Sequence, residues 1–420
     1  MDKIIVNGGN PLEGKIKIGG AKNAVLPIMT ACLLAPGKYT LTNVPNLKDT
    51  RTMSELLIRI GAEVSYRKHT LSINTENCNN PEAPYDLVKT MRASFYVLGP
   101  LLSRFGISKV SLPGGCAWGP RPVDYHIKAL KELGAEILLD SGYIIAKGSL
   151  VGTEIQFDNV SVGATGNVLM AAVKAEGLTV IRNAAQEPEI TLLCEFLNKM
   201  GANISGINTN TLTIEGVSEL NSVEEFEIVP DRIEAGTFLI ATAMAGGKIE
   251  LLGVNPDHLK IVLNFLEKVG SKVIIKNNSI KFIAPNKVLP IDMITSPFPG
   301  FPTDLQAQWL ALMTIANGDS KVTDEVYIDR FTHVAELTRL GAKISLNKNV
   351  ASIQGVSQLK CAQIMSTDIR ASASLIIAAL SAEGQSEISR IYHIDRGYEK
   401  IEEKFRNLGA DIWRQRADQL

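Results

Sequence analysis

The chain has 420 residues, of which 45% are hydrophobic and 21% are charged, and its formal net charge is -1 at pH 7. This length exceeds one ordinary hydrophobic core, because single cores stop growing at about 250–300 residues, so we expect two domains. With 43 basic and 44 acidic residues, the chain lacks the global positive field that attracts nucleic acid or an anionic membrane surface.

The first residues show none of the features of a secretory signal, and no later stretch reaches about 18 consecutive apolar residues, the length of a membrane span. We therefore expect a cytoplasmic protein without a membrane anchor. The five cysteines are an odd number and lie too far apart for a zinc-type pair or a disulfide framework. The five histidines show no paired helical spacing, so we expect reduced thiols and no metal.

Two glycine markers recur along the chain in the same order. The first marker follows an apolar helical run and comprises Gly37, Gly106, Gly177, Gly247, Gly318 and Gly384. The second ends an amphipathic helix about 25 residues later and comprises Gly61, Gly134, Gly201, Gly270, Gly341 and Gly409. Two markers that keep one offset six times indicate duplication of one unit rather than scattered helix caps.

Each unit predicts a leading loop, a buried helix, a strand, an amphipathic helix that ends in glycine, and one or two further strands. The first helix is apolar on nearly every side, which is typical of a helix inside a globule. We expect three units per domain, with sheets outside and three near-parallel helices as the core. The predicted domains are residues 21–229, and residues 1–20 together with 230–420. The first twenty residues precede the first unit, so we expect them to complete a sheet of the second domain.

Polar or charged side chains recur just before, or in the first turn of, each buried helix. They are Lys22 and Asn23, Lys89 to Arg92, Asn159 to Ser161, Asp231 and Arg232, Thr303 and Asp304, and Asp368 to Arg370. Helix N-termini attract anions through unpaired N–H groups and a partial positive charge, so these ends predict an anion-binding site. Ordinary capping is the alternative for the Asn, Ser and Asp members. The basic members favour a site, because the helix dipole disfavours cations at a helix start.

The segment 111–126 is rich in glycine and proline and carries a solitary cysteine, Cys116, with Arg121 nearby. This composition is typical of a mobile loop that closes over a ligand. A neighbouring guanidinium lowers the pKa of a thiol from about 8.5, which suits a general acid or a nucleophile. An incidental loop thiol is the alternative.

Motifs along the whole chain resemble those of the UDP-N-acetylglucosamine enolpyruvyl transferases. They are Gly20-Ala-Lys22-Asn23-Ala, Pro84-Tyr-Asp-Leu-Val-Lys-Thr-Met-Arg92-Ala-Ser, Pro113-Gly-Gly-Cys116, Arg121-Pro-Val-Asp124, Val160-Ser-Val-Gly163-Ala-Thr, Phe301-Pro-Thr-Asp304-Leu-Gln-Ala-Gln, Asp368-Ile-Arg370-Ala-Ser-Ala-Ser and His393-Ile-Asp-Arg396-Gly-Tyr. The resemblance implies an α/β fold of two inside-out α/β barrel domains, similar to EPSP synthase, each with three βαβαββ repeats. It also implies transfer of the enolpyruvyl group of phosphoenolpyruvate to the 3′-hydroxyl of UDP-N-acetylglucosamine, the first committed step of peptidoglycan synthesis, without cofactor or metal.

The resemblance also assigns roles to residues of this chain. Cys116 is the expected general acid, able to carry a covalent adduct of phosphoenolpyruvate, and Asp304 is the expected base. Lys22, Arg121 and Arg396 match the cations around the phosphate and carboxylate of phosphoenolpyruvate. The residues that align with sugar-nucleotide contacts are Arg92, Arg121, Pro122, Val123, Asp124, Tyr125, Asn159, Val160, Ser161, Val162, Gly163 and Val326. Asn23, Asp368 and Arg370 are expected to position and support the site.

Some residues depart from the family pattern, and two other functions compete with this one. Asn159 stands where relatives often carry lysine, Tyr125 stands where leucine is usual, and Trp118 with Pro120 alters the loop. The sister enzyme of the shikimate pathway shares the fold and phosphoenolpyruvate but lacks the Gly-Gly-Cys loop. A ring around nucleic acid would also show six repeats, but it needs an excess of positive charge. We expect no nucleic acid, membrane or obligate protein partner.

Overall fold

The computed structural model describes residues 2–112 and 123–416, and the chain divides into two compact units. The unit Gly20–Val229 is called the N-unit, and Met1–Gly19 together with Pro230–Leu420 is called the C-unit. The buried apolar side chains of each unit form a core cluster of their own. The chain therefore crosses between the units twice, next to Gly19 and next to Val229.

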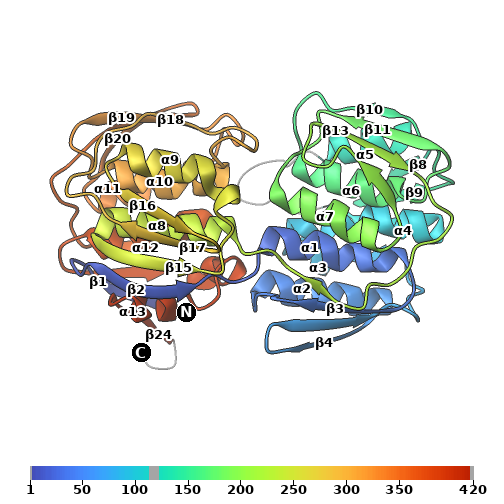
Figure 1. The fold of residues 1–420 in the computed structure, drawn as a ribbon, viewed down its shortest axis with the longest axis horizontal. Helices are drawn as coiled ribbons and strands as arrows, with labels where there is room; N and C mark the ends of the chain where they lie inside the picture. The colour runs from blue at the N-terminus through green and yellow to red at the C-terminus, as the bar shows by residue number, and fades with distance from the viewer. Residues whose placement is uncertain (1, 113–122, 417–420) are drawn as a thin grey trace. The chain divides into compact units, whose positions relative to one another are not determined.

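Across the described residues the strands form six four-stranded sheets, three in each unit (Figure 1). The sheets of the N-unit are β14 (Phe226–Glu227), β3 (Lys38–Thr42), β5 (Thr70–Asn74) and β4 (Glu63–Arg67); β6 (Glu82–Ala83), β7 (Ile107–Ser111), β9 (Tyr143–Lys147) and β8 (Glu136–Asp140); and β10 (Glu154–Gln156), β11 (Leu178–Arg182), β13 (Thr211–Glu215) and β12 (Asn203–Ser205). The sheets of the C-unit are β2 (Leu12–Lys17), β15 (Gly247–Leu252), β17 (Ser279–Ile283) and β16 (Lys272–Lys276); β18 (Met293–Ile294), β19 (Asp319–Thr323), β21 (Val350–Gln354) and β20 (Lys343–Asn347); and β22 (Gln363–Met365), β23 (Gln385–Ser389), β1 (Lys3–Asn7) and β24 (Asp411–Gln415).

All six sheets of the described chain use one pairing scheme. An outer strand runs parallel to its neighbour, and the other two contacts are antiparallel, as in the β10–β11, β11–β13 and β13–β12 pairs. The outer strand is the first strand of the βαβαββ repeat that the resemblance implied, and it stands where the hydrophobic pattern predicted only a leading loop. That expectation was wrong because strands as short as β6, β14 and β18, with two residues each, are too short to show a hydrophobic period.

The first two strands of the chain complete sheets of the C-unit. Strand β2 pairs parallel with β15, with Ile16 opposite Leu251. Strand β1 lies between β23 and β24 and is antiparallel to both. The last repeat has only β24 after its amphipathic helix, so β1 supplies the strand that it lacks. In the N-unit, β14 from the end of the unit likewise completes the sheet of the first repeat.

Six helices lie inside the sheets of their units (Figure 1). They are α1 (Lys22–Ala31), α4 (Leu98–Phe105) and α6 (Val162–Ala172) in the N-unit, and α8 (Arg232–Ala245), α10 (Gln306–Met313) and α12 (Ile369–Ser381) in the C-unit. In the C-unit these helices contact one another, and in the N-unit α4 packs on α6. Helix α12 is buried without interruption from Arg370 to Leu380, as expected for a helix with apolar neighbours on every side. The fold is thus the inside-out α/β arrangement that the resemblance implied.

The amphipathic helices pack against buried helices or strands of their unit. They are α2 (Lys48–Ile60), α5 (Asp124–Glu132), α7 (Pro188–Lys199), α9 (Lys260–Lys268), α11 (His333–Arg339) and α13 (Ile401–Asn407). Shorter helices are η1 (Cys32–Leu34), α3 (Tyr85–Val88), η2 (Arg92–Val97), η3 (Pro256–Leu259), η4 (Thr303–Leu305) and η5 (Ile391–Arg396). All the marker glycines have positive φ, from +68° at Gly106 to +144° at Gly37 and Gly318. Side chains disfavour this conformation, which explains why glycine recurs in every repeat.

Within residues 2–112 and 123–416, no helix combines the length and the apolar character needed to cross a bilayer. The longest buried helix of this part, α8, has 14 residues, whereas a span needs about 20.

Two histidines are buried, one in each unit, and this predicts acid sensitivity. Burial lowers the pKa of His126 to about 3 and that of His333 to about 4, from an ordinary value of 6.5. As the pH falls below about 6.5, the unfolded chain binds protons that the native chain does not, so stability is lost. We expect the free energy of unfolding to fall by up to about 1.4 kcal/mol per pH unit for each histidine until its native pKa is reached.

Urea unfolding at several pH values between about 7 and 4 measures this slope. His126→Gln and His333→Gln should each flatten it, because glutamine does not titrate. An unchanged slope in both variants would contradict the prediction.

Candidate active site

Three of the polar residues at helix starts are caps. The Asp368 carboxylate accepts from the backbone N–H groups of Arg370 at 2.7 Å and Ala371 at 3.0 Å. Asp231 Oδ1 accepts from the second and third residues of α8 at 2.8 and 3.1 Å, and Ser161 Oγ accepts from Ala164 N at 3.2 Å. Capping therefore accounts for the presence of these three side chains.

Asp304 does not cap a helix, and its carboxylate forms two ion pairs instead. It lies in η4 at the start of α10, with its side chain 23% exposed. Arg330 Nη1 is 2.7 Å from Oδ1, and Arg370 Nη2 is 2.7 Å from Oδ2. Each carboxylate oxygen thus has its own guanidinium partner, and the arrangement fixes the plane of the carboxylate.

The two arginines decide the protonation state of Asp304. Burial by itself would raise the pKa of this carboxyl, but Arg370 and Arg330 outweigh burial and hold the pKa well below its usual range. Asp304 is therefore ionised at neutral pH. A carboxylate stabilised in this way is a weak base, so it can accept a proton readily only when one of the two ion pairs loosens.

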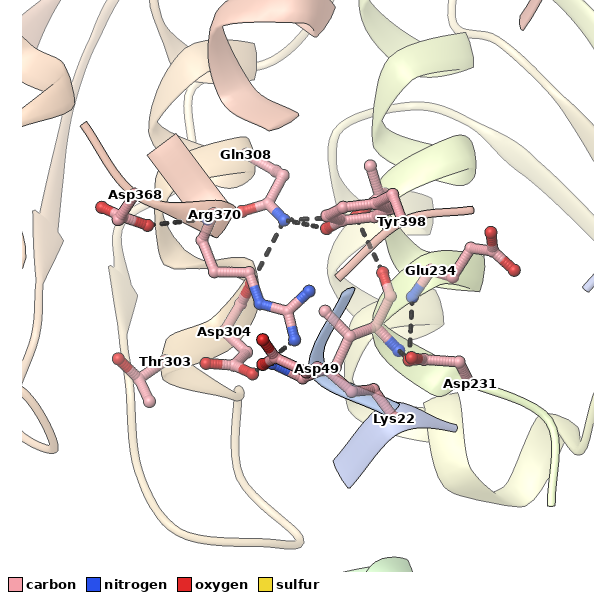
Figure 2. A network of polar contacts seen from close by, with 12 residues as sticks. Lys22, Asp49, Asp231, Glu234, Thr303, Asp304, Gln308, Asp368, Arg370 and Tyr398 are labelled. Atoms are coloured by element: carbon pink, nitrogen blue, oxygen red, sulfur yellow. Dashed lines mark hydrogen bonds and ion pairs between the residues drawn. The ribbon is translucent and has the colours of Figure 1, made fainter. Parts of the chain in front are cut away.

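A buried polar network connects Asp304 to the three buried helices of the C-unit, α8, α10 and α12 (Figure 2). Gln308 Nε2 donates to the Asp304 carbonyl oxygen at 3.2 Å, and to the hydroxyl oxygens of Tyr398 at 3.2 Å and Thr237 at 3.1 Å. The Arg370 guanidinium lies 5.5 Å from the centroid of the Tyr398 ring. Because these side chains come from α8, α10, α12 and the turn after η5, the network holds the starts of the helices in one arrangement.

A fully buried carboxylate, Asp324, anchors the loop that carries Arg330. Its Oδ1 accepts from the backbone N–H groups of Val326 at 3.0 Å and Tyr327 at 2.8 Å, and its Oδ2 accepts from Thr303 Oγ1 at 2.6 Å. Arg330 Nη1 also lies 3.3 Å from Thr303 Oγ1. Asp324 thus fixes the loop against η4, next to Asp304.

The sequence analysis missed Arg330 because this residue does not stand at a helix start. Another position shared by several repeats could have identified Arg330. Arg330 lies between the strand and the amphipathic helix of its repeat, and Arg121 and Arg396 hold the same place in theirs. Asp324 had no such signal, since its role depends on hydrogen bonds that the sequence does not reveal.

In the N-unit, the expected substrate-binding lysine is buried beside a carboxylate. Lys22 is the first residue of α1, and it is 8% exposed. Its Nζ lies 3.5 Å from Oδ2 of Asp49, which is buried in the first turn of α2. The carboxylate offsets both the burial of the ammonium and the unfavourable helix dipole. Sequence reasoning missed Asp49, which lies in an amphipathic rather than a buried helix.

The start of α5 is held by hydrogen bonds to α6 and its leading segment. Asn167, inside α6, joins His126 Nδ1 at 3.0 Å and accepts from Gly99 N at 2.6 Å. The Tyr125 hydroxyl accepts from Asn159 Nδ2 at 2.9 Å. Asn159 and Tyr125, two of the residues that depart from the family pattern, are therefore partners of each other.

The structure places the other predicted site residues as follows. Val123 is the N-cap of α5 and Asp124 its first residue, Asn23 lies in α1, and Arg92 begins η2. Val160 and Val162 pack against the core next to Ser161, and the α6 residue Gly163 lies beside the His126 ring. Val326 is exposed, Arg396 ends η5, and Arg232 lies over the Phe298 ring. Cys116, Arg121 and Pro122 lie outside the described residues.

Thiols and metal ligands are the other groups that could carry chemistry. In the described part of the chain Cys32, Cys78 and Cys194 are buried and free, while Cys361 is exposed. Burial raises the pKa of Cys194 to about 12, so this thiol stays protonated. No group of three His, Cys, Asp or Glu side chains within these residues could hold a metal ion.

Solved structures with the same arrangement define the class of fold. The crystal structure of the enolpyruvyl transferase NikO from Streptomyces tendae matches with a TM-score of 0.89 at 23% identity, and the match covers 99% of both chains. The EPSP synthase of Acinetobacter baumannii matches with a TM-score of 0.78 at 18% identity, over 99% of this chain and 100% of that one. The chain therefore has the enolpyruvyl transferase fold.

The sequence matches the family described as EPSP synthase (3-phosphoshikimate 1-carboxyvinyltransferase) over residues 6–405. The chain belongs to this family. It is 55% identical to the UDP-N-acetylglucosamine 1-carboxyvinyltransferase of Chloroherpeton thalassium, over 100% of this chain and 99% of the relative. The enzymes of the same name from Prosthecochloris aestuarii and Trichlorobacter lovleyi are 53% and 50% identical, each over 99% of this chain and 98% and 99% of the relatives.

Proposed function

We propose that this chain transfers the enolpyruvyl group of phosphoenolpyruvate to the 3′-hydroxyl of UDP-N-acetylglucosamine and releases phosphate, for peptidoglycan synthesis in the cytoplasm. Relatives with this activity in their names, identical at half of the positions or more over the full length, support the proposal. The observation that carries it is Asp304, an ionised carboxylate held by Arg330 and Arg370 at a helix start. Such a group can accept a proton from a hydroxyl that is aligned against it once one of its two ion pairs loosens.

The proposed reaction is an addition followed by an elimination. Cys116 protonates the methylene carbon of phosphoenolpyruvate, which makes the adjacent carbon electrophilic. The sugar hydroxyl attacks that carbon while Asp304 accepts its proton. The former methylene carbon then returns a proton to the Cys116 thiolate while phosphate leaves the adjacent carbon with the proton held by Asp304, which restores the double bond and both side chains. In a side path the Cys116 sulfur adds to the same carbon and gives a covalent adduct.

The remaining site residues bind charge in this proposal. Lys22, Arg121 and Arg396 neutralise the phosphate and carboxylate of phosphoenolpyruvate. The sugar nucleotide is bound by Arg92, by Arg121 to Tyr125, by Asn159 to Gly163, and by Val326. Asn23, Asp368 and Arg370 position these groups. The proposal requires no metal, cofactor, nucleic acid or protein partner.

Phosphate release from phosphoenolpyruvate tests the acceptor. We expect release with UDP-N-acetylglucosamine and none above background with shikimate 3-phosphate. Release with shikimate 3-phosphate alone would instead assign the 3-phosphoshikimate 1-carboxyvinyltransferase reaction, after which the family is named.

Covalent labelling tests the proposed acid. An epoxide analogue of phosphoenolpyruvate such as fosfomycin should label one thiol, Cys116, and abolish turnover, since a thiolate opens an epoxide. Cys116→Ala should remove both the label and the turnover. Cys361→Ser is the matched control, because Cys361 is the exposed thiol of the described chain. Mass spectrometry that finds the label on Cys361, or full turnover in Cys116→Ala, would contradict the assignment.

A further inference from the structure

Arg396 depends on its surroundings for its position. It is the last residue of η5, a 3-10 helix of six residues between β23 and α13. A helix this short makes few hydrogen bonds of its own, so tertiary contacts hold it. Tyr398, two residues further on, belongs to the buried network with Thr237 and Gln308. Asp395, which precedes Arg396 in the chain, forms an ion pair with Arg414.

Arg414, in the C-terminal strand β24, binds both oxygens of the Asp395 carboxylate. Nη2 lies 2.6 Å from Oδ1, and Nη1 lies 3.0 Å from Oδ2. The third nitrogen, Nε, donates to Glu402 Oε1 in the first turn of α13 at 2.8 Å. Arg414 is itself fixed by the sheet, where it stands opposite Ile4 of β1. One guanidinium thus bridges two carboxylates and joins η5 to α13.

The ion pair with Arg414 affects the carboxylate of Asp395, which is next to Arg396 in the chain. Asp395 is its neighbour in the chain, and the Asp395 side chain is 36% exposed. With Arg414 in place, both Asp395 oxygens accept hydrogen bonds from a guanidinium, which Asp395 shares with Glu402. Without Arg414, an unbalanced carboxylate would stand next to a cation that has to attract an anion, and it would compete for that cation.

We propose that Arg414 is a positioning residue for the anionic substrate, because by holding both oxygens of Asp395 it keeps this carboxylate from weakening Arg396. The inference rests on the proposed function, in which Arg396 binds phosphoenolpyruvate. Arg414 acts through Asp395 and does not touch the substrate. The C-terminal strand, which has no other part in the site, thereby contributes to substrate affinity.

The test is a kinetic comparison of the full chain with Arg414→Gln. We expect the KM for phosphoenolpyruvate to rise about tenfold, with kcat and the KM for UDP-N-acetylglucosamine within about twofold, because the loss concerns one charge beside one substrate. Arg414→Lys should fall between, since lysine keeps the charge but cannot bind both oxygens in the same way. Asp395→Asn placed in Arg414→Gln should restore most of the affinity, because it removes the unbalanced charge.

The decisive outcome is the behaviour of the double variant. A merely structural role of Arg414 would raise both KM values, lower kcat, and gain nothing from Asp395→Asn, and any of these results would overturn the inference. Lys3→Gln is the matched control, because it removes an ion pair with Glu387 from the same sheet without touching η5. If Arg414→Gln does not fold, Arg414→Lys with and without Asp395→Asn decides the question. Calorimetric Kd values for phosphoenolpyruvate compare the variants without turnover. They therefore test the role of Arg414 even if UDP-N-acetylglucosamine is not the acceptor.

Discussion

Asp304→Asn is expected to lower kcat about a thousandfold, within the range for removal of a general base, while UDP-N-acetylglucosamine still binds. Asparagine has nearly the same shape as aspartate but cannot accept the hydroxyl proton. The measurement is kcat from phosphate release, together with a Kd for UDP-N-acetylglucosamine from calorimetry. A loss in kcat without a comparable loss in affinity separates proton transfer from binding.

Asp319→Asn is the control for this experiment. Asp319 lies exposed in β19 of the same repeat, so its substitution should leave kcat and the free energy of unfolding nearly unchanged. If Asp304→Asn retained a tenth or more of the turnover, Asp304 would not be the base.

Arg370→Met is expected to reduce the free energy of unfolding by about 3–5 kcal/mol, as is typical when one partner of a buried ion pair is removed. The Arg370 side chain is 3% exposed and pairs with Asp304 at 2.7 Å. Methionine fills much of the volume but leaves the carboxylate with Arg330 alone. Urea unfolding of the wild-type protein and of the Arg370→Met variant measures the difference in the free energy of unfolding.

The same variant should change the pH dependence of turnover. The Coulombic attraction of Arg370 is the largest of the effects that lower the pKa of Asp304, so the loss of Arg370 should raise that pKa and move the acid limb of the pH–rate profile to higher pH. Arg339→Met is the matched control, because Arg339 is more than half exposed and pairs loosely with Glu336. A loss of stability no larger than that of Arg339→Met would contradict the structural role of Arg370.

The repeat architecture could be predicted from the sequence because its signals are local. The marker glycines mark positions that need positive φ, and the apolar runs mark helices with no exposed face. Both signals lie within one segment, and a sequence displays them directly. The placement of β1 and β2 in the C-unit followed from counting units, since the first twenty residues precede the first repeat.

The chemistry of the helix starts could not be separated from capping by the sequence. Asp304 and Asp368 are the same residue type at the same position of their repeats, yet Asp368 caps α12 whereas Asp304 pairs with arginines. The difference lies in Arg330, which is 26 residues from Asp304 in the sequence. The sequence does not show which side chains from distant segments meet.

The sequence by itself therefore determined the number of repeats, the inside-out arrangement of the domains and the family resemblance. The repeats could be found because backbone conformation and the burial of a helix leave local signatures in the sequence. Only the tertiary structure decided which acidic groups cap helices and which are held as ionised carboxylates. It also placed Asp49 beside Lys22, and Arg414 beside Asp395. The physical reason is that charge and hydrogen-bonding partners are set by contacts in space, and these contacts join residues that are far apart in the chain.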